Sequence, residues 1–257
     1  MERLAAQYEK KINLSFSIFP YAKCSNLVTE PYNSMLALHR LLEQANSVVV
    51  LDNEAVSDIC RKSLNVNKPT FANMNNLIAQ VIASATESFR YDISASATMQ
   101  EFEANLVPYP RISSLIPSYS PLLSSNSIHE GHPSVFEMTS NLFDPSTVMV
   151  RCDPQKGKYL ACTMFYRGNI VPRDISACIA HLKTRRCIKF VDWCPTGFKV
   201  SINYQLPTKI VGSDLAKIDR EVSMISNNTA ITKVFARINA EFDSPYATRE
   251  HLHMYID

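Results

Sequence analysis

One long stripe of apolar residues constrains the fold of this chain more than any other feature of its sequence. The stripe keeps spacings of three and four residues and consists of Met74, Leu77, Ile78, Val81, Ile82, Ala85 and Phe89. This periodicity is typical of an amphipathic helix with one buried face. Thr70 follows Pro69 at the expected start, and no Gly or Pro interrupts the pattern before Arg90. The sequence therefore predicts one long helix that serves as a spine between two differently patterned halves.

The first third of the chain alternates strand and helix patterns. Residues 14–18 alternate apolar side chains with serine, and residues 48–51 form a continuous apolar run, as in a buried parallel strand. Helical patterns over residues 33–45 and 54–64 follow these two strands. The order strand, helix, strand, helix predicts part of a parallel, doubly wound α/β sheet.

Polar side chains lie near the predicted carboxyl ends of these strands, where ligands of doubly wound sheets bind. They are Asn26, Glu30 and Asn53. Asn at a strand end is also ordinary turn chemistry, so the residues alone leave both interpretations open. A loop over residues 91–100 then leads to Glu101, whose carboxylate is either a functional group or a solvated residue in the first turn of a helix.

Beyond residue 111 the pattern is that of an α+β unit. Residues 113–133 are rich in Ser, Pro and Asn, which predicts a loop. The elements expected after it are a helix over 133–143, strands over 148–152 and 159–166, a helix over 173–185 and a strand over 198–204. A last helical stripe from Ile231 to Phe242, after a cap at Asn228 or Thr229, predicts the start of a further helical region.

Charge and cysteine content exclude several classes of protein. The chain of 257 residues has a formal net charge of +2, so nothing draws it as a whole to nucleic acid or to an acidic membrane. Its seven cysteines include no C-x-x-C pair, which favours reduced thiols over a disulfide framework or a zinc site. A charged N-terminal helix and the lack of a membrane-length apolar run predict a cytosolic protein. His129 and His132 could share a metal only with Glu130, and we expect a solvated loop there and no metal site.

Several blocks of the sequence resemble tubulin. They are Glu30-Pro-Tyr-Asn-Ser, Asn105-Leu-Val-Pro-Tyr-Pro-Arg, Cys152-Asp-Pro-x-x-Gly-Lys-Tyr, Tyr166-Arg-Gly-Asn-Ile-Val-Pro and Phe190-Val-Asp-Trp-Cys-Pro-Thr-Gly-Phe-Lys-Val. The long loop at 205–217 and the glutamate at position 101 are similar to α-tubulin, since β chains have a shorter loop and a lysine there. The resemblance runs from Met1 to Asp257, and by it the chain is identified as a divergent, truncated member of the α-tubulin family.

This resemblance implies an α/β fold in four regions. They are the later part of a Rossmann-like GTPase domain at 1–70, a central helix at 71–91, an intermediate α+β domain at 92–228 and the start of the C-terminal helices at 229–257. The family's phosphate-binding loop and its Mg²⁺-organising acidic residues are expected upstream of Met1. Its C-terminal helical hairpin and acidic tail are expected beyond Asp257.

The resemblance also implies a site for GTP with Mg²⁺. Asn53 and Asn75 match residues that hydrogen-bond the guanine or the ribose, and Glu30 matches a ribose contact. Phe71 replaces a tyrosine that stacks on the base, which keeps the aromatic face and loses the hydroxyl. Asn26 replaces a threonine at a nucleotide-contacting position.

Glu101 matches the catalytic glutamate of α-tubulin, which projects toward the nucleotide of a neighbouring β-tubulin. A carboxylate suits this role because it can position or deprotonate the attacking water. The function implied is a microtubule subunit of the cytoplasmic cytoskeleton that pairs with β-tubulin and contributes to GTP binding and hydrolysis. Neither nucleic acid nor a membrane is expected as a partner.

Departures from the family pattern put the GTPase activity in doubt, and the changed loop at 93–98 favours an alternative. The five glycines are not clustered, whereas a phosphate cradle uses consecutive backbone N–H groups and close approach at glycine. Residues 93–98 also differ, with Ser96 in place of an asparagine and Thr98 in place of an aspartate. The alternative is a non-polymerising protein that binds β-tubulin or tubulin-folding factors and has no GTPase activity, so enzymatic activity stays an open question.

Overall fold

The computed structural model describes residues 2–8, 11–20, 27–91, 98–125, 133–184, 188–194 and 197–255. The helices are α1 (Glu2–Gln7), α2 (Glu30–Gln44), α3 (Asn53–Lys62), α4 (Phe71–Ala85), α5 (Glu87–Arg90), α6 (Met99–Leu106), α7 (Val135–Asn141), α8 (Pro172–Thr184) and α9 (Thr232–Ala247). The strands are β1 (Leu14–Phe19), β2 (Ser47–Asp52), β3 (Ser114–Ser120), β4 (Tyr159–Gly168), β5 (Phe198–Asn203) and β6 (Arg220–Asn228). Short 3-10 helices are η2 (Pro154–Lys156), η3 (Thr229–Ile231) and η4 (Leu252–Met254).

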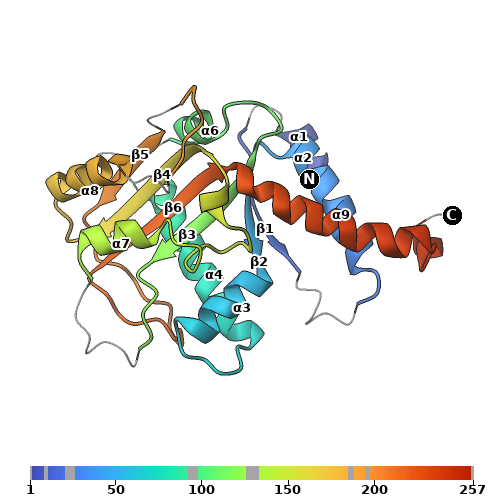
Figure 1. Cartoon of the computed structure of the whole chain (residues 1–257), viewed down its shortest axis with the longest axis horizontal. Helices are drawn as coiled ribbons and strands as arrows, with labels where there is room; N and C mark the ends of the chain where they lie inside the picture. The colour runs from blue at the N-terminus through green and yellow to red at the C-terminus, as the bar shows by residue number, and fades with distance from the viewer. Residues whose placement is uncertain are drawn as a thin grey trace.

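The strands form one mixed six-stranded sheet in the order β1-β2-β3-β6-β4-β5 (Figure 1). The first three strands are parallel, as is the β4–β5 pair, whereas β6 runs antiparallel to both of its neighbours. The predicted α/β class with a parallel βαβα beginning is therefore confirmed. The strands of the second half extend the same sheet, because β3 pairs with β2 and β6 pairs with β3.

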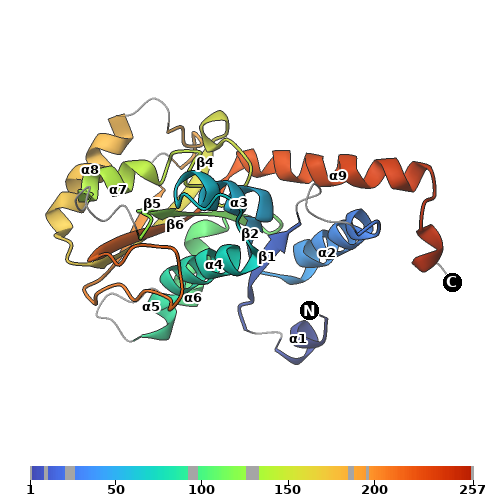
Figure 2. The ribbon, with the colours of Figure 1, turned by 90° about the horizontal axis from the view of Figure 1, so that it is seen from below.

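Both faces of the sheet are covered by helices. Figure 2 shows α7 and α9 on one side of the sheet and α4 and α6 on the other. The apolar side chains of β2 pack against the helices on both faces of the sheet, because successive side chains of a strand point to opposite faces. Val48 and Val50 pack with Val234 of α9, whereas Val49 packs with Phe102 of α6. This double burial explains why the run is continuously apolar.

The prediction of one long helix is correct at its start and wrong about its end. Its start is as expected, since Thr70 caps α4 and forms a reciprocal capping box with Asn73. The helix ends at Ala85, and the four-residue α5 follows Thr86. The Thr86 hydroxyl donates to the carbonyl of Ile82 (2.7 Å). Such side-chain bonding competes with the regular backbone pattern and is a known cause of helix distortion.

One loop assignment and one strand assignment from sequence are also wrong, and a further strand was not expected. Residues 114–120, expected in a loop, form β3 at the centre of the sheet and are buried throughout. Proline has no backbone N–H and is rare in a central strand. β3 tolerates Pro117 because β3 pairs with β2 only at Ser114 and Leu115, so no hydrogen bond of that ladder is lost. Residues 148–152, expected as a strand, form only an isolated bridge, between Val148 and Ser118. β6 was not expected, because its buried face contains serine and asparagine.

Candidate functional site

The first turn of α3 is fixed by a buried ionic network at the carboxyl end of β2. Asp52 has no exposed surface, and its Oδ1 accepts a hydrogen bond from the Glu54 N–H (2.9 Å), which caps the helix. Arg237 of α9 donates to Asp52 Oδ2 at 2.5 Å. Burial raises the pKa of Asp52, and the hydrogen bond and charge of Arg237 oppose that rise.

Glu54 extends this network to two basic side chains. It pairs with Arg151, and its Oε2 lies 3.7 Å from Nη1 of Arg237. Asn53, between the two acids, is the first residue of α3 and is half-buried. The network therefore holds the sequence-predicted Asn53 in a fixed position, with its backbone in the first helical turn.

The sequence-predicted residues of α4 share one face of that helix. Phe71 is its first residue and exposes 66% of its surface, and Asn75, also exposed, lies one turn later. Residues four positions apart on a helix are neighbours on its surface. Asn73 in the same turn donates to Asp214 Oδ2 (2.6 Å), which anchors the start of α4 to the second half of the chain.

The predicted nucleotide residues occupy the starts of three helices. Glu30, Asn53 and Phe71 are the first residues of α2, α3 and α4. The α2 and α3 starts follow the carboxyl ends of the neighbouring parallel strands β1 and β2. No hydrogen bond or ion pair joins the side chains of these three residues and Asn75 in the described part of the chain. Asn26, His129, Glu130 and His132 lie outside the described residues.

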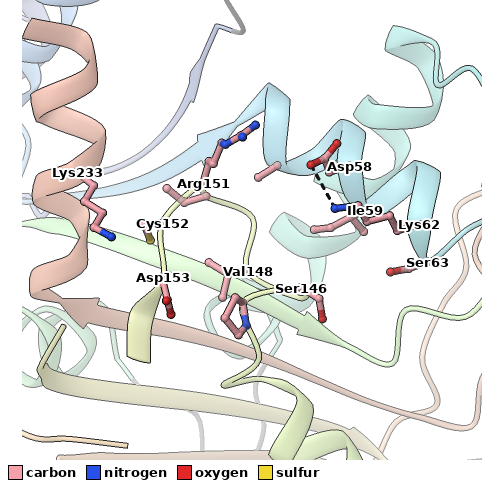
Figure 3. Close-up of a pocket in the computed structure, with 13 residues that line it drawn as sticks. Asp58, Ile59, Lys62, Ser63, Ser146, Val148, Arg151, Cys152, Asp153 and Lys233 are labelled. Atoms are coloured by element: carbon pink, nitrogen blue, oxygen red, sulfur yellow. Dashed lines mark ion pairs between the residues drawn. The ribbon is translucent and has the colours of Figure 1, made fainter. Parts of the chain in front are cut away.

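A hollow near this region lies on the face of α3 that points away from Asn53. It has a volume of about 330 Å³ and is bounded by α3, the 145–153 segment and Lys233 of α9 (Figure 3). None of the sequence-predicted nucleotide residues lines it. Burial raises the pKa of the Cys152 thiol in its wall to about 12, and that of Cys60 on α3 to about 11. These thiols are protonated at neutral pH, so neither is an activated nucleophile.

The described residues fit only part of a GTP–Mg²⁺ site. Aromatic, amide and carboxylate groups of the kinds that bind a base and a ribose are present at the starts of α2, α3 and α4. No group of three His, Cys, Asp or Glu side chains suited to a metal occurs among the described residues. The described residues thus include groups of the kinds that bind a nucleoside, without a cluster of three side chains that would hold a metal by themselves.

The glycines also serve purposes other than a phosphate cradle. An added Cβ at Gly157, Gly168 or Gly197 would come within 2.1 to 3.0 Å of other protein atoms, so these glycines allow the chain to pack on itself. Gly212 has a φ of +80° in an open turn. Gly131 lies outside the described residues. The described glycines therefore form no phosphate cradle.

Glu101 lies at the third position of α6, with its side chain in a capping box. The Thr98 hydroxyl accepts from the Glu101 N–H, and Glu101 Oε2 accepts from the Thr98 N–H, both at 3.2 Å. The side chain is exposed. Phe102 and Leu106 anchor the opposite face of α6 in the core. One carboxylate oxygen is thus engaged, and the carboxylate lies on the surface, where a partner could reach it.

Comparison with known proteins identifies the family. The sequence model of the tubulin C-terminal domain matches residues 110–240, and that of the tubulin/FtsZ family GTPase domain matches residues 1–61. The chain belongs to the tubulin family. The tubulin alpha-3 chain of Zea mays is 50% identical over 256 residues, which is 100% of this chain and 57% of that protein. The α-tubulin resemblance is therefore confirmed, and this tubulin-family chain spans little more than half the length of that relative.

Sequence reasoning missed the basic partners that hold the start of α3. Asp52 followed by a helical pattern is a recognisable N-cap signal. Its partner Arg237 is 185 residues away in the chain, and no local pattern links the two. In this tubulin-family chain, none of the helices formed by the described residues is long and apolar enough to cross a bilayer.

Proposed function

We propose that this chain is an α-tubulin-type subunit of the cytoplasmic microtubule cytoskeleton that pairs head-to-tail with β-tubulin. The 50% identity to an α-tubulin over the whole chain carries this proposal. A head-to-tail contact uses two different surfaces of each subunit. Exposed aromatic and apolar surface at two separate places on the molecule supports such an arrangement.

The first surface lies where the end of α9 meets the start of α2. Tyr255 stacks on Tyr32 (5.1 Å between ring centroids) and donates to Asn33 Oδ1 (2.7 Å). The neighbouring Tyr246 exposes 52% of its surface, and Val28 exposes 61%. This end of α9 projects beyond the sheet in Figure 1. Rigid aromatic side chains of this kind are typical anchors of protein interfaces.

The second surface lies beyond the end of α6. Tyr109, three residues after α6, makes an edge-to-face contact with Trp193 (5.7 Å between centroids). Both rings are more than half exposed. Figure 1 shows α6 well away from the projecting end of α9. The two apolar surfaces therefore suit contacts with two different neighbours in a polymer.

In this proposal, Glu101 acts on GTP bound by the adjoining β-tubulin. Its carboxylate would orient or deprotonate the water that attacks the γ-phosphate. Asn53, Asn75 and Phe71, with Glu30 and Asn26, would contribute contacts to the base and ribose of a second nucleotide. Mg²⁺ would accompany the phosphates through groups outside the described residues.

Steady-state GTP hydrolysis by co-assembled chain and β-tubulin tests this role. Glu101→Gln keeps the size and the capping hydrogen bond while removing the base, so we expect hydrolysis to fall by about 100-fold or more. Glu103→Gln, two residues along the same helix, is the matched control and should hydrolyse at the wild-type rate. Equal rates for Glu101→Gln and wild type would show that this carboxylate takes no part in the reaction.

A second candidate is a non-polymerising protein that binds β-tubulin or tubulin-folding factors without GTPase activity. The observation that favours it is that the described glycines are separated and packed against other protein atoms or lie in an open turn, so they form no phosphate cradle. Co-sedimentation separates the two proposals, because a polymer subunit appears in the pellet with β-tubulin. A chain that binds soluble β-tubulin, and stays in the supernatant at every ratio, would support the second candidate.

A further inference from the structure

A buried cluster of two acids and one base lies where α5, β4 and β6 meet. Glu221, Glu87 and Arg167 expose 0%, 4% and 7% of their surfaces. Arg167 Nη2 lies 3.1 Å from Glu87 Oε1, and its Nη1 lies 3.8 Å from Glu221 Oε1. Arg167 and Glu221 also face each other across the β4–β6 ladder. With both acids ionised, the cluster would hold a net charge of −1 out of contact with bulk water, which is costly.

Arg167 is the only basic residue that is buried in the part of the chain that the structure describes. The groups that face them from the packed elements are Tyr119 on β3, Gln80 and Ser84 on α4, Asn203 on β5, Arg90 on α5 and Lys209 in the loop before β6. Tyr119 and Gln80 donate to Glu221 Oε2 at 2.6 and 3.2 Å. Arg90 and Lys209 are exposed, so water screens their charges.

The cluster is covered by residues 204–219, which connect β5 to β6 and are called the cover segment below. Members of the cluster and its shell hold this segment directly. Arg167 Nε donates to the carbonyl of Gln205 (3.4 Å), and Gln80 Nε2 donates to the carbonyl of Thr208 (3.1 Å). Beside Glu221 the cover segment leaves a cavity of about 10 Å³, room for about one water. The carboxylate cannot gain a hydration shell while the segment is in place.

We propose that the cover segment is a pH-sensitive lid over the Glu87–Arg167–Glu221 cluster. It stays closed while the two acids share one proton, and it opens to admit water when both are ionised. The closed state then has one positive and one negative charge in contact. Opening hydrates the second carboxylate and breaks the contacts of Arg167 and Gln80 with the segment.

The direction of the pH dependence follows from the closed state. Burial raises the pKa of Glu221 and of Glu87, and the charge of Arg167 opposes the rise at both residues. A group whose pKa is raised on closing binds its proton more tightly in the closed state. The closed state is therefore fully favoured near the ordinary glutamate pKa of 4.5, and it loses stability as pH rises through the raised pKa.

Amide hydrogen exchange followed by mass spectrometry tests this lid on the full chain between pH 5.5 and 8.5. After correction for intrinsic exchange, we expect protection of residues 204–219 to fall with rising pH, by up to about tenfold per pH unit for one proton per opening. Glu221→Gln keeps the shape without the charge, so its protection should stay at the low-pH level throughout. The exposed Glu43, paired with Arg40 at the surface, supplies the control Glu43→Gln, which should keep the wild-type slope.

A second variant keeps the test decisive if Glu221→Gln does not fold. Glu87→Gln removes the other acid of the same cluster and should also flatten the pH profile of residues 204–219. A wild-type slope in a folded Glu87→Gln or Glu221→Gln chain would overturn the proposal. Protection that is independent of pH in the wild-type chain would overturn it as well.

Discussion

The Asp52–Arg237 pair gives a stability prediction whose size follows from the structure. Arg237→Met keeps the aliphatic stem of Arg237 and removes its charge, which leaves a fully buried carboxylate at the start of α3. Breaking a buried ion pair in this way costs about 3–5 kcal/mol. Arg237 has 29% of its side chain exposed, and Asp52 keeps its hydrogen bond from Glu54. We therefore expect a loss of about 2–3 kcal/mol in the free energy of unfolding.

A double-mutant cycle measured by urea unfolding isolates the pair. Asp52→Asn retains a side-chain oxygen for the cap and removes the charge, so it should relieve much of the cost of Arg237→Met. The two changes together should be less destabilising than their sum by about 1–2 kcal/mol. Arg61→Met is the matched control, because Arg61 pairs with Asp58 at 3.8 Å on the surface and should contribute less than about 1 kcal/mol.

Two results would refute this reasoning. One is an Arg237→Met chain that is no less stable than Arg61→Met. The other is strict additivity of Asp52→Asn and Arg237→Met, which would mean that the two charges do not interact. A change in the urea m-value would show instead that the unfolding reaction itself had changed.

Two further predictions concern the core and the thiols. Phe102 is 2% exposed and contacts Phe89 at 5.3 Å between ring centroids. Phe102→Ala should therefore lower the free energy of unfolding, measured in urea, by about 3–5 kcal/mol. A loss below about 1 kcal/mol would contradict this packing. The pKa of Cys60 is raised from 9.0 to about 11, so its thiolate fraction at pH 8 should be about one hundredth that of a free thiol. Alkylation followed by mass spectrometry should therefore modify Cys60 only as pH approaches 11, and rapid labelling at pH 8 would contradict the burial.

The parts of the fold with one clear local signal were predictable. β2 is an apolar run that ends at a helix-capping aspartate, and both features were visible in the sequence. β3 and β6 were not, because their buried positions hold serine and, in β6, asparagine. In β6, two of these side chains pair with polar groups elsewhere in the fold. Ser84 with Ser223, and Asn227 with the Leu106 carbonyl, are two such pairs. Their burial depends on partners that no local pattern reveals.

In the candidate site, too, some features were predictable from the sequence and others were not. Asn53 and Phe71 at helix starts follow from cap and stripe patterns, but their proposed contacts with GTP come only from the resemblance to tubulin. The Arg237 contact at the start of α3 and the buried pairing of Glu87 with Arg167 needed the tertiary structure. Val148 to Val150 imitate a strand, since burial alone makes this irregular segment apolar.

Native mass spectrometry of the chain co-expressed with β-tubulin tests the central claim most directly. The account predicts a 1:1 heterodimer, weakened by Tyr246→Glu on the exposed end of α9. Val211→Glu, at a residue that is 96% exposed in the loop before β6, should leave the heterodimer intact. A chain that never carries β-tubulin, or a heterodimer unaffected by Tyr246→Glu, would contradict the proposed pairing.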